Sequence, residues 1–404
     1  MSVPLDINDF ISKHITRREI SFFETDLNCN EDILLREIKG KRLLVIGGAG
    51  TIGSAFVKAS LHYFPASVVV VDINENGLTE LVRDLRSEND VVVPDDFRTY
   101  PIDFGDATFY RLLNAEPKFD IVANFAAHKH VRSEKDIFSI EALIRNNVFK
   151  TRALLEALTK KKPSHFFCVS TDKAANPTNI MGASKKVMEE LVLVYQHQFK
   201  VTTARFANVA FSNGSLLAGF VERVSKRQPL STPSDVKRYF VSPTESGQLC
   251  LLACVCAENG QIVFPKLPES AMKLFVDIAH EFVVAMGYVV QECSTEEEAR
   301  KLSLALKSGS RAYPIYSFKS DTEGEKLFEE FFTSSETIAM NQFLSLGVVL
   351  TKKSQDLDIV NSFLDRLNHL FSISPDKNEL VRALQEFIPE FEHVTKGLSL
   401  DKKM

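Results

Sequence analysis

The sequence has 404 residues, of which 45% are hydrophobic and 25% charged, which is the composition of a folded globular protein and not of a disordered or collagen-like chain. Its formal charge of -5 provides no basic face for nucleic acid, so we expect no nucleic-acid partner. No apolar run reaches the roughly 18 to 20 residues that cross a bilayer, so we expect no membrane insertion. The first residues lack the pattern of a signal peptide or transit peptide, which favours a cytoplasmic location.

From Arg42 onwards, short apolar runs alternate with amphipathic stretches. This alternation of strand and helix predicts an α/β fold with a doubly wound parallel sheet that carries helices on both faces. The predicted strands are 42–48, 67–72, 98–103, 119–127, 165–171 and 201–206, and the predicted helices between them include 51–64, 75–87, 137–161 and 185–198.

The first predicted strand runs into the stretch VIGGAGTIGS, in which Gly47, Gly50 and Gly53 are regularly spaced. Glycines there allow a tight turn, the approach of a pyrophosphate to the backbone, and close packing of helix on strand. The helix that follows offers its N–H groups and positive dipole end to phosphates. Asp72 ends the second strand nineteen residues after Gly53, where a carboxylate accepts both ribose hydroxyls. The pattern predicts NAD in preference to NADP, although Asp72 also fits a solvated carboxylate at a strand end.

The six cysteines are irregularly spaced, and three of them lie in the apolar run LCLLACVCA at 249–257. This pattern favours reduced thiols in a buried core over disulfides. Cys254 and Cys256 also fit half of a metal site, but no second pair of cysteines or histidines stands at ligand spacing. We therefore predict no metal.

Several stretches taken together resemble one family. They are GGAGTIGS, NFAAHKHVRSEKD, VSTDKAANPTNIMGASK, RFANVAFSNGS and DTEGEKLFEEFF, and they look like the UDP-N-acetylglucosamine 4,6-dehydratases, a CapD-like group of the extended short-chain dehydrogenase/reductase family. The resemblance covers about Gly40 to Phe332, and the ending PEFEHVTKGLSLDKKM is similar to tails in that group. It implies a Rossmann-like fold with a smaller C-terminal substrate domain, NAD as cofactor, a UDP-sugar substrate and a homo-oligomer.

The length exceeds what one compact core usually supports, which predicts a main domain and a smaller one. Beyond about Ser212 the alternation loosens into loops with prolines, and from about Ser335 the pattern is mostly helical, as in 354–371 and 378–394. We divide the chain into an N-terminal extension (1–40) of unsettled role, an NAD-binding Rossmann domain (41–211), a substrate domain interleaved with it (212–334) and a helical C-terminal segment (335–404).

The usual catalytic pair of the family is a tyrosine and a lysine spaced Y-x-x-x-K, one helical turn apart. None of the eight tyrosines has a lysine four residues later; Met181 occupies the tyrosine position and Lys185 the lysine position. A thioether takes no proton. The resemblance to members that carry methionine implies an active enzyme, in which Lys185 contacts the cofactor ribose and Thr171, with a water molecule, relays the proton of the sugar O4.

Asp172 and Lys173 stand where sister dehydratases carry an aspartate and a glutamate. By resemblance, oxidation at C4 of the sugar makes the C5 proton acidic, Lys173 takes that proton as base, and Asp172 protonates the departing C6 hydroxyl as acid. These roles require a protonated Asp172 and a neutral Lys173 near pH 7, which burial favours. The alternative is a structural ion pair at a strand end. An epimerase that works at C4 alone gains nothing from such a pair.

Further polar residues are predicted around this centre. Asp103, which ends the third strand, contacts the adenine edge or forms a turn. His128 and His130 fit a metal pair, but the resemblance places Lys129 and His130 in the sugar pocket. The predicted cofactor contacts are Gly47, Gly50, Thr51, Ile52, Gly53, Asp72, Asp103, Ala126, Ala127 and Lys185.

The remaining predicted residues bind the substrate. Asn147 orders a water or is a plain polar helix residue, Arg238 pairs with a phosphate through its planar guanidinium, and Glu325 with Lys326 organises the uridine site or lies on the surface. The predicted substrate contacts are Lys129, His130, Asn147, Asn208, Ser212, Gly214, Ser215, Arg238, Glu325 and Lys326.

The first hypothesis is therefore an NAD-dependent dehydratase that converts UDP-N-acetylglucosamine to a UDP-4-keto-6-deoxy-N-acetylhexosamine. The methionine-containing members imply retention at C5. The alternatives are a UDP-sugar epimerase or C5-inverting dehydratase, and a catalytically silent NAD-binding sensor, which only Met181 suggests.

Overall fold

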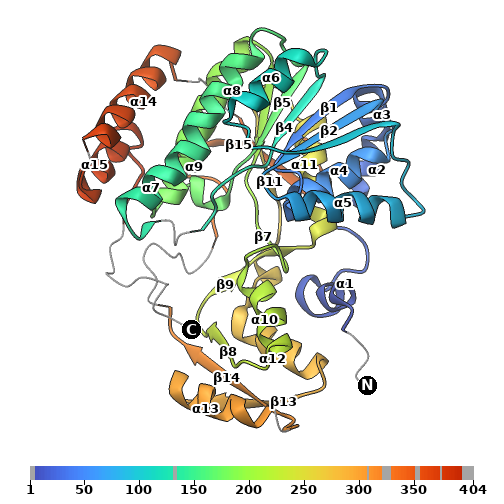
Figure 1. The fold of residues 1–404 in the computed structure, drawn as a ribbon, viewed down its shortest axis with the longest axis vertical. Helices are drawn as coiled ribbons and strands as arrows, with labels where there is room; N and C mark the ends of the chain where they lie inside the picture. Colours follow the sequence, from blue (N-terminus) through green and yellow to red (C-terminus); the bar gives the residue numbers. More distant parts are fainter. Residues whose placement is uncertain are drawn as a thin grey trace.

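The main body of the protein is a nine-stranded sheet in the order β15-β16-β11-β6-β5-β4-β1-β2-β3 (Figure 1). The computed structural model describes residues 5–130, 134–306, 309–320, 329–350, 355–373 and 375–393. The six predicted strands pair in parallel, in the order of a doubly wound dinucleotide-binding sheet, which confirms the predicted fold class. They are β1 (Arg42–Ile46), β2 (Ser67–Asp72), β3 (Asp96–Pro101), β4 (Ile121–Asn124), β5 (His165–Val169) and β6 (Lys200–Ala204).

Helices cover both faces of this sheet, because each stretch between strands carries an apolar stripe that needs burial. In Figure 1, α4 and α11 lie on one face and α7, α8 and α9 on the other, and each set contributes to a separate hydrophobic cluster. The helices of the main body are α4 (Thr51–Leu61), α5 (Glu75–Ser87), α6 (Ala107–Ala115), α7 (Ile137–Ile144), α8 (Lys150–Leu158), α9 (Ile180–Val194) and α11 (Pro243–Val255).

Two of these helices differ from the sequence prediction. The helix predicted at 185–198 begins earlier, at Ile180, because the Asn179 side chain accepts the N–H of Gly182 and caps it. The helix predicted at 137–161 contains a π-helical turn, η3 (Arg145–Phe149), between α7 and α8. Both differences bear on the site, since α9 carries Met181 and Lys185, and η3 carries Asn147.

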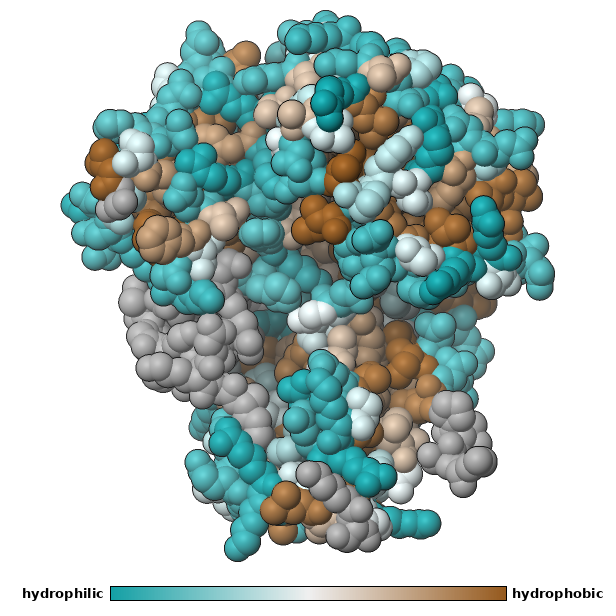
Figure 2. Space-filling model, viewed as in Figure 1, coloured by the Kyte–Doolittle hydropathy of each residue, from teal (hydrophilic) through white to brown (hydrophobic). Residues whose placement is uncertain are grey.

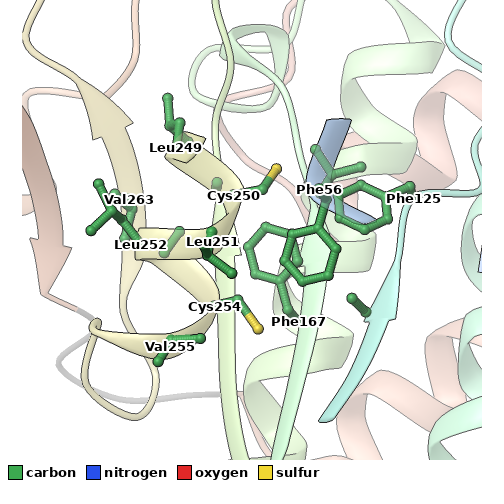
Figure 3. Packing of buried hydrophobic residues seen from close by; sticks show 14 of the residues in the cluster. Phe56, Phe125, Phe167, Leu249, Cys250, Leu251, Leu252, Cys254, Val255 and Val263 are labelled. Atoms are coloured by element: carbon green, nitrogen blue, oxygen red, sulfur yellow. The ribbon is translucent and has the colours of Figure 1, made fainter. Parts of the chain in front are cut away.

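The cysteines of α11 lie in the core between that helix and the sheet. Figure 3 shows Cys250 and Cys254 turned toward the aromatic rings of Phe56, Phe125 and Phe167. Both thiols are buried, and burial raises the pKa of Cys254 to about 12. They are therefore apolar packing groups, as predicted.

The C-terminal segment is only partly as predicted. It begins with two strands, β15 (Thr337–Ala339) and β16 (Leu346–Leu350), which extend the main sheet: β16 pairs antiparallel with β11 (Ile262–Pro265), and β15 pairs antiparallel with β16. The prediction of a mostly helical segment did not include these strands, since the short apolar run 346–350 pairs with a strand on each side in the main sheet. Helices α14 (Leu357–Ser372) and α15 (Lys377–Phe387) follow, and they pack on the α9 side (Figure 1).

A smaller lobe lies next to the carboxyl end of the main sheet, in the lower half of Figure 1. Its three-stranded sheet has the order β13-β14-β8, and two short strand pairs, β7 with β10 and β9 with β12, connect it to the main body. Its elements are β7 (Asn208–Val209), β8 (Leu230–Pro233), β9 (Lys237–Arg238), β10 (Phe240–Val241), β12 (Lys273–Leu274), β13 (Val289–Cys293), β14 (Ala312–Phe318), α10 (Leu216–Ser225), α12 (Phe275–Ala285) and α13 (Glu296–Leu306).

The N-terminal extension joins the two lobes. Phe10 is buried in the core of the small lobe, whereas Phe23 and Leu34 are buried in the main core. Between them, the guanidinium of Arg18 donates two hydrogen bonds of 2.8 Å to the carboxylate of Glu245. The elements of this extension, here named the strap (residues 5–38), are α1 (Ile7–Phe10), the π-helical η1 (Ile11–Thr16), α2 (Glu24–Cys29) and α3 (Glu31–Ile38).

The face of the molecule shown in Figure 2 is mostly hydrophilic, and its hydrophobic residues form small, separate patches. None of the helices within the described ranges combines the length and the apolar character that spanning a membrane requires.

Candidate active site

The glycine-rich loop has the backbone that the sequence predicts. Gly47 has φ +75°, and a Cβ there would lie 2.5 Å from the backbone nitrogen of Ala126. A Cβ on Gly53 would lie 2.3 Å from the carbonyl oxygen of Gly47. Contacts this short exclude side chains at both positions. Gly50 immediately precedes α4, so the N-terminus of that helix faces the loop, as a pyrophosphate site requires.

Asp72 lies at the end of β2 beside this loop. Its two carboxylate oxygens accept the backbone N–H groups of Ala49 and Asn74, each at 2.9 Å. These bonds hold the carboxylate in place next to the glycine loop, and each oxygen retains a second lone pair for a ribose hydroxyl. The position fits the predicted cofactor contact.

Asp103 lies in a turn. It accepts the N–H of Gly105 at 2.7 Å and forms an ion pair with Lys150. Burial opposes ionisation, but the hydrogen bonds from Lys150 and Gly105 outweigh it and lower the pKa of the Asp103 carboxyl. These contacts support the turn role, which the sequence left open beside the adenine contact.

Asn147 connects the loop after β4 to α9. Its amide oxygen accepts the N–H of His128 at 2.8 Å, and its amide nitrogen donates to the His128 carbonyl at 2.9 Å and to the Ser184 hydroxyl at 3.1 Å. The residue is only 1% exposed. Because protein groups already engage both ends of the amide, these contacts support the alternative of a polar helix residue, and the substrate contact of Asn147 stays a prediction.

Three loops meet at the carboxyl end of the sheet. The ammonium of Lys129 donates to the carbonyl of Asn213 at 2.8 Å, and the Asn213 N–H donates to the Thr51 hydroxyl at 3.0 Å. Gly214 has φ +73°, and a Cβ there would lie 3.0 Å from Nε2 of His130. The structure thus brings together residues that were predicted separately for the cofactor and for the substrate.

The other residues predicted to bind the cofactor or the substrate lie in the same loops or at the starts of the helices that follow them. Ala126 and Ala127 follow β4, and the Ala126 N–H donates to the Asn124 side chain at 3.0 Å. Ser212 is buried, and the Ser215 hydroxyl caps α10 by accepting the N–H of Ala218. Ile52 is half-buried in the first turn of α4. The predicted residues Glu325 and Lys326 lie outside the described residues.

Thr171, Asp172 and Lys173 follow β5 and contact one another directly. The Thr171 hydroxyl donates to Oδ1 of Asp172 at 2.7 Å, and the Lys173 ammonium lies 3.1 Å from both carboxylate oxygens. Asp172 is buried, whereas Lys173 is partly exposed. A carboxylate that accepts from two donors is the ion-pair arrangement that the sequence left open as an alternative.

Met181 and Lys185 lie in the first turns of α9. Met181 is buried, and its backbone N–H donates to Oε1 of Glu134 at 3.1 Å. The ammonium of Lys185 donates to the Val169 carbonyl at the end of β5, at 3.0 Å. Burial lowers the pKa of Lys185. The helix therefore holds Lys185 next to the strand that leads to Asp172.

The sequence prediction missed Glu329, which is buried in the same site. Its carboxyl oxygens accept hydrogen bonds from the Asn208 amide at 2.9 Å and from the Tyr239 backbone N–H at 3.0 Å. Burial, and then the charge of Asp172, raise the pKa of Glu329 to about 8 against the opposing charges of Lys173 and Arg238. No periodic pattern marks this glutamate, because it lies in an irregular segment; the one hint of burial is that aromatic residues flank the pair Glu329 and Glu330 in the run FEEFF.

The sequence also missed the buried ion-pair network behind the site. Arg205 is 0% exposed, and its guanidinium donates to both oxygens of Glu189 and of Glu336, at 2.7 to 2.9 Å. Arg205 also donates to the carbonyl of Phe331, while the Ser170 hydroxyl donates to Glu189. The network, defined as Ser170, Glu189, Arg205 and Glu336, therefore ties the segment that carries Glu329 to the end of β5.

Known proteins share both the sequence and this fold. The model of the polysaccharide biosynthesis protein family matches residues 43–349. A relative from Methanocaldococcus jannaschii, named as an uncharacterized membrane protein, is 32% identical over 77% of this chain and 86% of its own length. The capsular polysaccharide biosynthesis protein CapD from Staphylococcus aureus is 27% identical over 75% of this chain, which spans only 47% of that relative's length.

Two solved structures show the same fold at low identity. Pen from Bacillus thuringiensis superposes with a TM-score of 0.64 at 21% identity, covering 82% of this chain and 98% of that chain. A double mutant of DesIV, a dTDP-glucose 4,6-dehydratase from Streptomyces venezuelae solved with NAD, superposes with a TM-score of 0.52 at 19% identity, covering 72% and 88%. Because the family model matches most of this chain, the chain belongs to the polysaccharide biosynthesis protein family.

Proposed function

We propose that this protein is an NAD-dependent nucleotide-sugar 4,6-dehydratase whose substrate is UDP-N-acetylglucosamine. The observation that carries the proposal is the contact of a buried carboxyl, Asp172, with an amine, Lys173, at the carboxyl end of β5. Elimination of water from a 4-keto sugar needs a base for the C5 proton and an acid for the leaving O6, and a change of configuration at C4 alone needs no catalytic group at either position.

The glycine loop and Asp72 support NAD as the cofactor. Gly47 and Gly53 leave space where any side chain would collide with backbone, and Asp72 is fixed at the neighbouring strand end. Bound NAD would supply the hydride acceptor for C4 of the sugar and the hydride donor for C6. Lys185, buried beneath this position, would hold the ribose, and Arg238, which is also buried, would pair with the diphosphate.

The ion pair between Asp172 and Lys173 is compatible with the acid and base roles, because the two forms differ by a single proton. A sugar that excludes water from the site weakens the solvation of both charges, which favours transfer of the Lys173 proton to Asp172 along their 3.1 Å hydrogen bond. The neutral amine then takes the C5 proton, and the carboxylic acid protonates the leaving O6. The products of this step are water and the original ion pair.

Thr171 is proposed to replace the missing phenol. Its hydroxyl, held in place by the hydrogen bond to Asp172, would pass the proton of the sugar O4 to a water molecule and on to solvent, so that Asp172 takes its proton from Lys173 alone. Met181 takes no part in proton transfer, since a thioether has no proton to give and is not a base at this pH.

Incubation of the purified protein with UDP-N-acetylglucosamine tests the proposal, with the product analysed by mass spectrometry and NMR. The expected product has lost one water and carries a new methyl group at C6. An isomer of unchanged mass would instead identify a UDP-sugar epimerase, and its C5 configuration would separate the retaining from the inverting reaction. Binding of NAD without any turnover would favour the sensor.

A further inference from the structure

We propose that the Thr51 hydroxyl couples the two ligand sites through the backbone of Asn213, so that NAD at the glycine loop makes the neighbouring loop, residues 210–215, bind the nucleotide of the substrate more tightly. The inference rests on the proposed function for the identity of the two ligands, NAD and a UDP-sugar. It adds a dependence of one binding event on the other.

The loop 210–215 has a backbone that needs support from outside. Phe211 has φ +53° and Gly214 has φ +73°, so both lie in the left-handed region. That region costs glycine little, but it strains a residue with a large side chain such as Phe211. Strained residues persist where surrounding contacts hold them, and the Phe211 ring is held in the small lobe by packing against Phe10 and Phe282.

Two further contacts reach the loop at Asn213, between the two left-handed residues. The Asn213 N–H donates to the hydroxyl of Thr51 at 3.0 Å, and the Asn213 carbonyl accepts from the ammonium of Lys129 at 2.8 Å. The loop is therefore joined on one side to the first turn of α4 and on the other to the loop after β4.

These two contacts differ in how a bound ligand can affect them. The loop that carries Lys129 is already fixed, because the buried Asn147 side chain accepts the N–H of the adjacent His128 and donates to its carbonyl. Thr51 is the first residue of α4 and directly follows Gly50 of the glycine loop. A pyrophosphate at that helix end would therefore act on the loop through Thr51.

The Thr51 hydroxyl has the chemistry to serve the loop and the cofactor together. A hydroxyl has one proton and two lone pairs, so accepting the Asn213 N–H leaves its proton for a pyrophosphate oxygen of NAD. Donation to an anion polarises the O–H group, and hydrogen bonds in a chain strengthen one another. NAD would thereby stabilise the loop that contains Ser212, Gly214 and Ser215, the predicted contacts of the substrate nucleotide.

Isothermal titration calorimetry of the full-length protein with UDP, without NAD and at saturating NAD, tests the coupling. We expect NAD to lower the Kd of UDP by about fivefold or more, and UDP to lower the Kd of NAD by the same factor, because coupling between two sites is reciprocal. Thr51→Val keeps the shape of the side chain without the hydroxyl and should abolish the coupling. Thr51→Ser keeps the hydroxyl and should retain it.

Two further variants sharpen the test. Thr51→Ala removes the same hydroxyl, and it takes the place of Thr51→Val if that variant fails to fold. Lys129→Met removes the other contact of Asn213 but leaves the route from NAD through Thr51, so the coupling should persist even where UDP binds more weakly. The coupling is a ratio of two affinities of one protein, so a general loss of affinity leaves it unchanged.

Equal affinity for UDP with and without NAD in the wild type, or the wild-type factor in Thr51→Val, would overturn the inference. Neither measurement involves turnover, so that result leaves the dehydratase proposal standing. Conversely, an isomerised sugar of unchanged mass would end the dehydratase proposal and leave a measured coupling intact.

Discussion

Met181 is the residue at which this chain departs most clearly from the pattern it resembles. A tyrosine there would place its hydroxyl at the site, whereas the methionine side chain is buried and contributes packing alone. The backbone at this position keeps a polar contact, since its N–H donates to Glu134. Under the proposed dehydration, the proton chemistry would rest on the residues after β5, where the Thr171 hydroxyl contacts Asp172.

The sequence identified the residues whose chemistry follows from a motif. Asp172 and Lys173 contact each other after β5, and Lys185 donates to the Val169 carbonyl at the end of the same strand; their catalytic roles stay predictions. Glu329 was not identified, since it is distant in sequence and is held there by long-range hydrogen bonds from Asn208 and Tyr239. Asn147 was recognised as polar, but its partners depend on a π-helical turn that no periodicity shows.

At the scale of elements, the six parallel strands were predictable, because buried parallel strands read as continuous apolar runs. Strands β15 and β16 were not, since they are short: β16 pairs with β11, which lies far away in the sequence, and β15 pairs with β16. The segment 329–336 also depends on contacts with residues that are distant in the sequence, such as Arg205. It has no regular structure, and buried charges hold it in place.

We predict that Arg205→Leu destabilises the protein strongly. The substitution leaves Glu189, which is 0% exposed, without its main partner, and breaking a buried pair in this way costs about 3–5 kcal/mol. Urea unfolding measures the change. Arg36→Leu, which removes an exposed pair with Glu37, is the matched control and should have little effect. A small change for Arg205→Leu would show that the network is not structural.

The same network sets an acid limit on stability. Burial opposes ionisation of Glu189, but Arg205 outweighs it, so the pKa of Glu189 in the folded protein lies below its ordinary value of 4.5. Its contribution is therefore present above about pH 4.5 and is lost as the pH falls through the lower, folded value.

At the scale of the whole molecule, the strap gives the sequence's unassigned N-terminal extension a structural role. It contributes Phe10 to the core of the small lobe and Phe23 to that of the main body. The predicted site lies at the carboxyl end of the main sheet, where the small lobe joins it (Figure 1). The strap therefore helps to fix the lobe that would cover a nucleotide sugar.

We predict that Arg18→Ala loosens this connection. Glu245 is 3% exposed and would lose both hydrogen bonds from the guanidinium, which should cost about 3 kcal/mol or more in the free energy of unfolding. Thermal unfolding and limited proteolysis between the lobes measure the effect. Lys13→Ala removes an exposed pair with Asp9 in the same extension and is the control. Equal behaviour of the two variants would contradict a connecting role.

The most direct test of the account follows reduction of bound NAD and loss of water in Asp172→Asn after addition of UDP-N-acetylglucosamine. We expect the absorbance of the reduced nicotinamide to appear while loss of water slows by at least about 100-fold, since elimination of water needs the acid and oxidation at C4 does not. Asp90→Asn, which changes an exposed aspartate, should behave like wild type. Loss of water at the wild-type rate in Asp172→Asn, or failure of both steps, would contradict the assignment of Asp172 as the acid of the elimination.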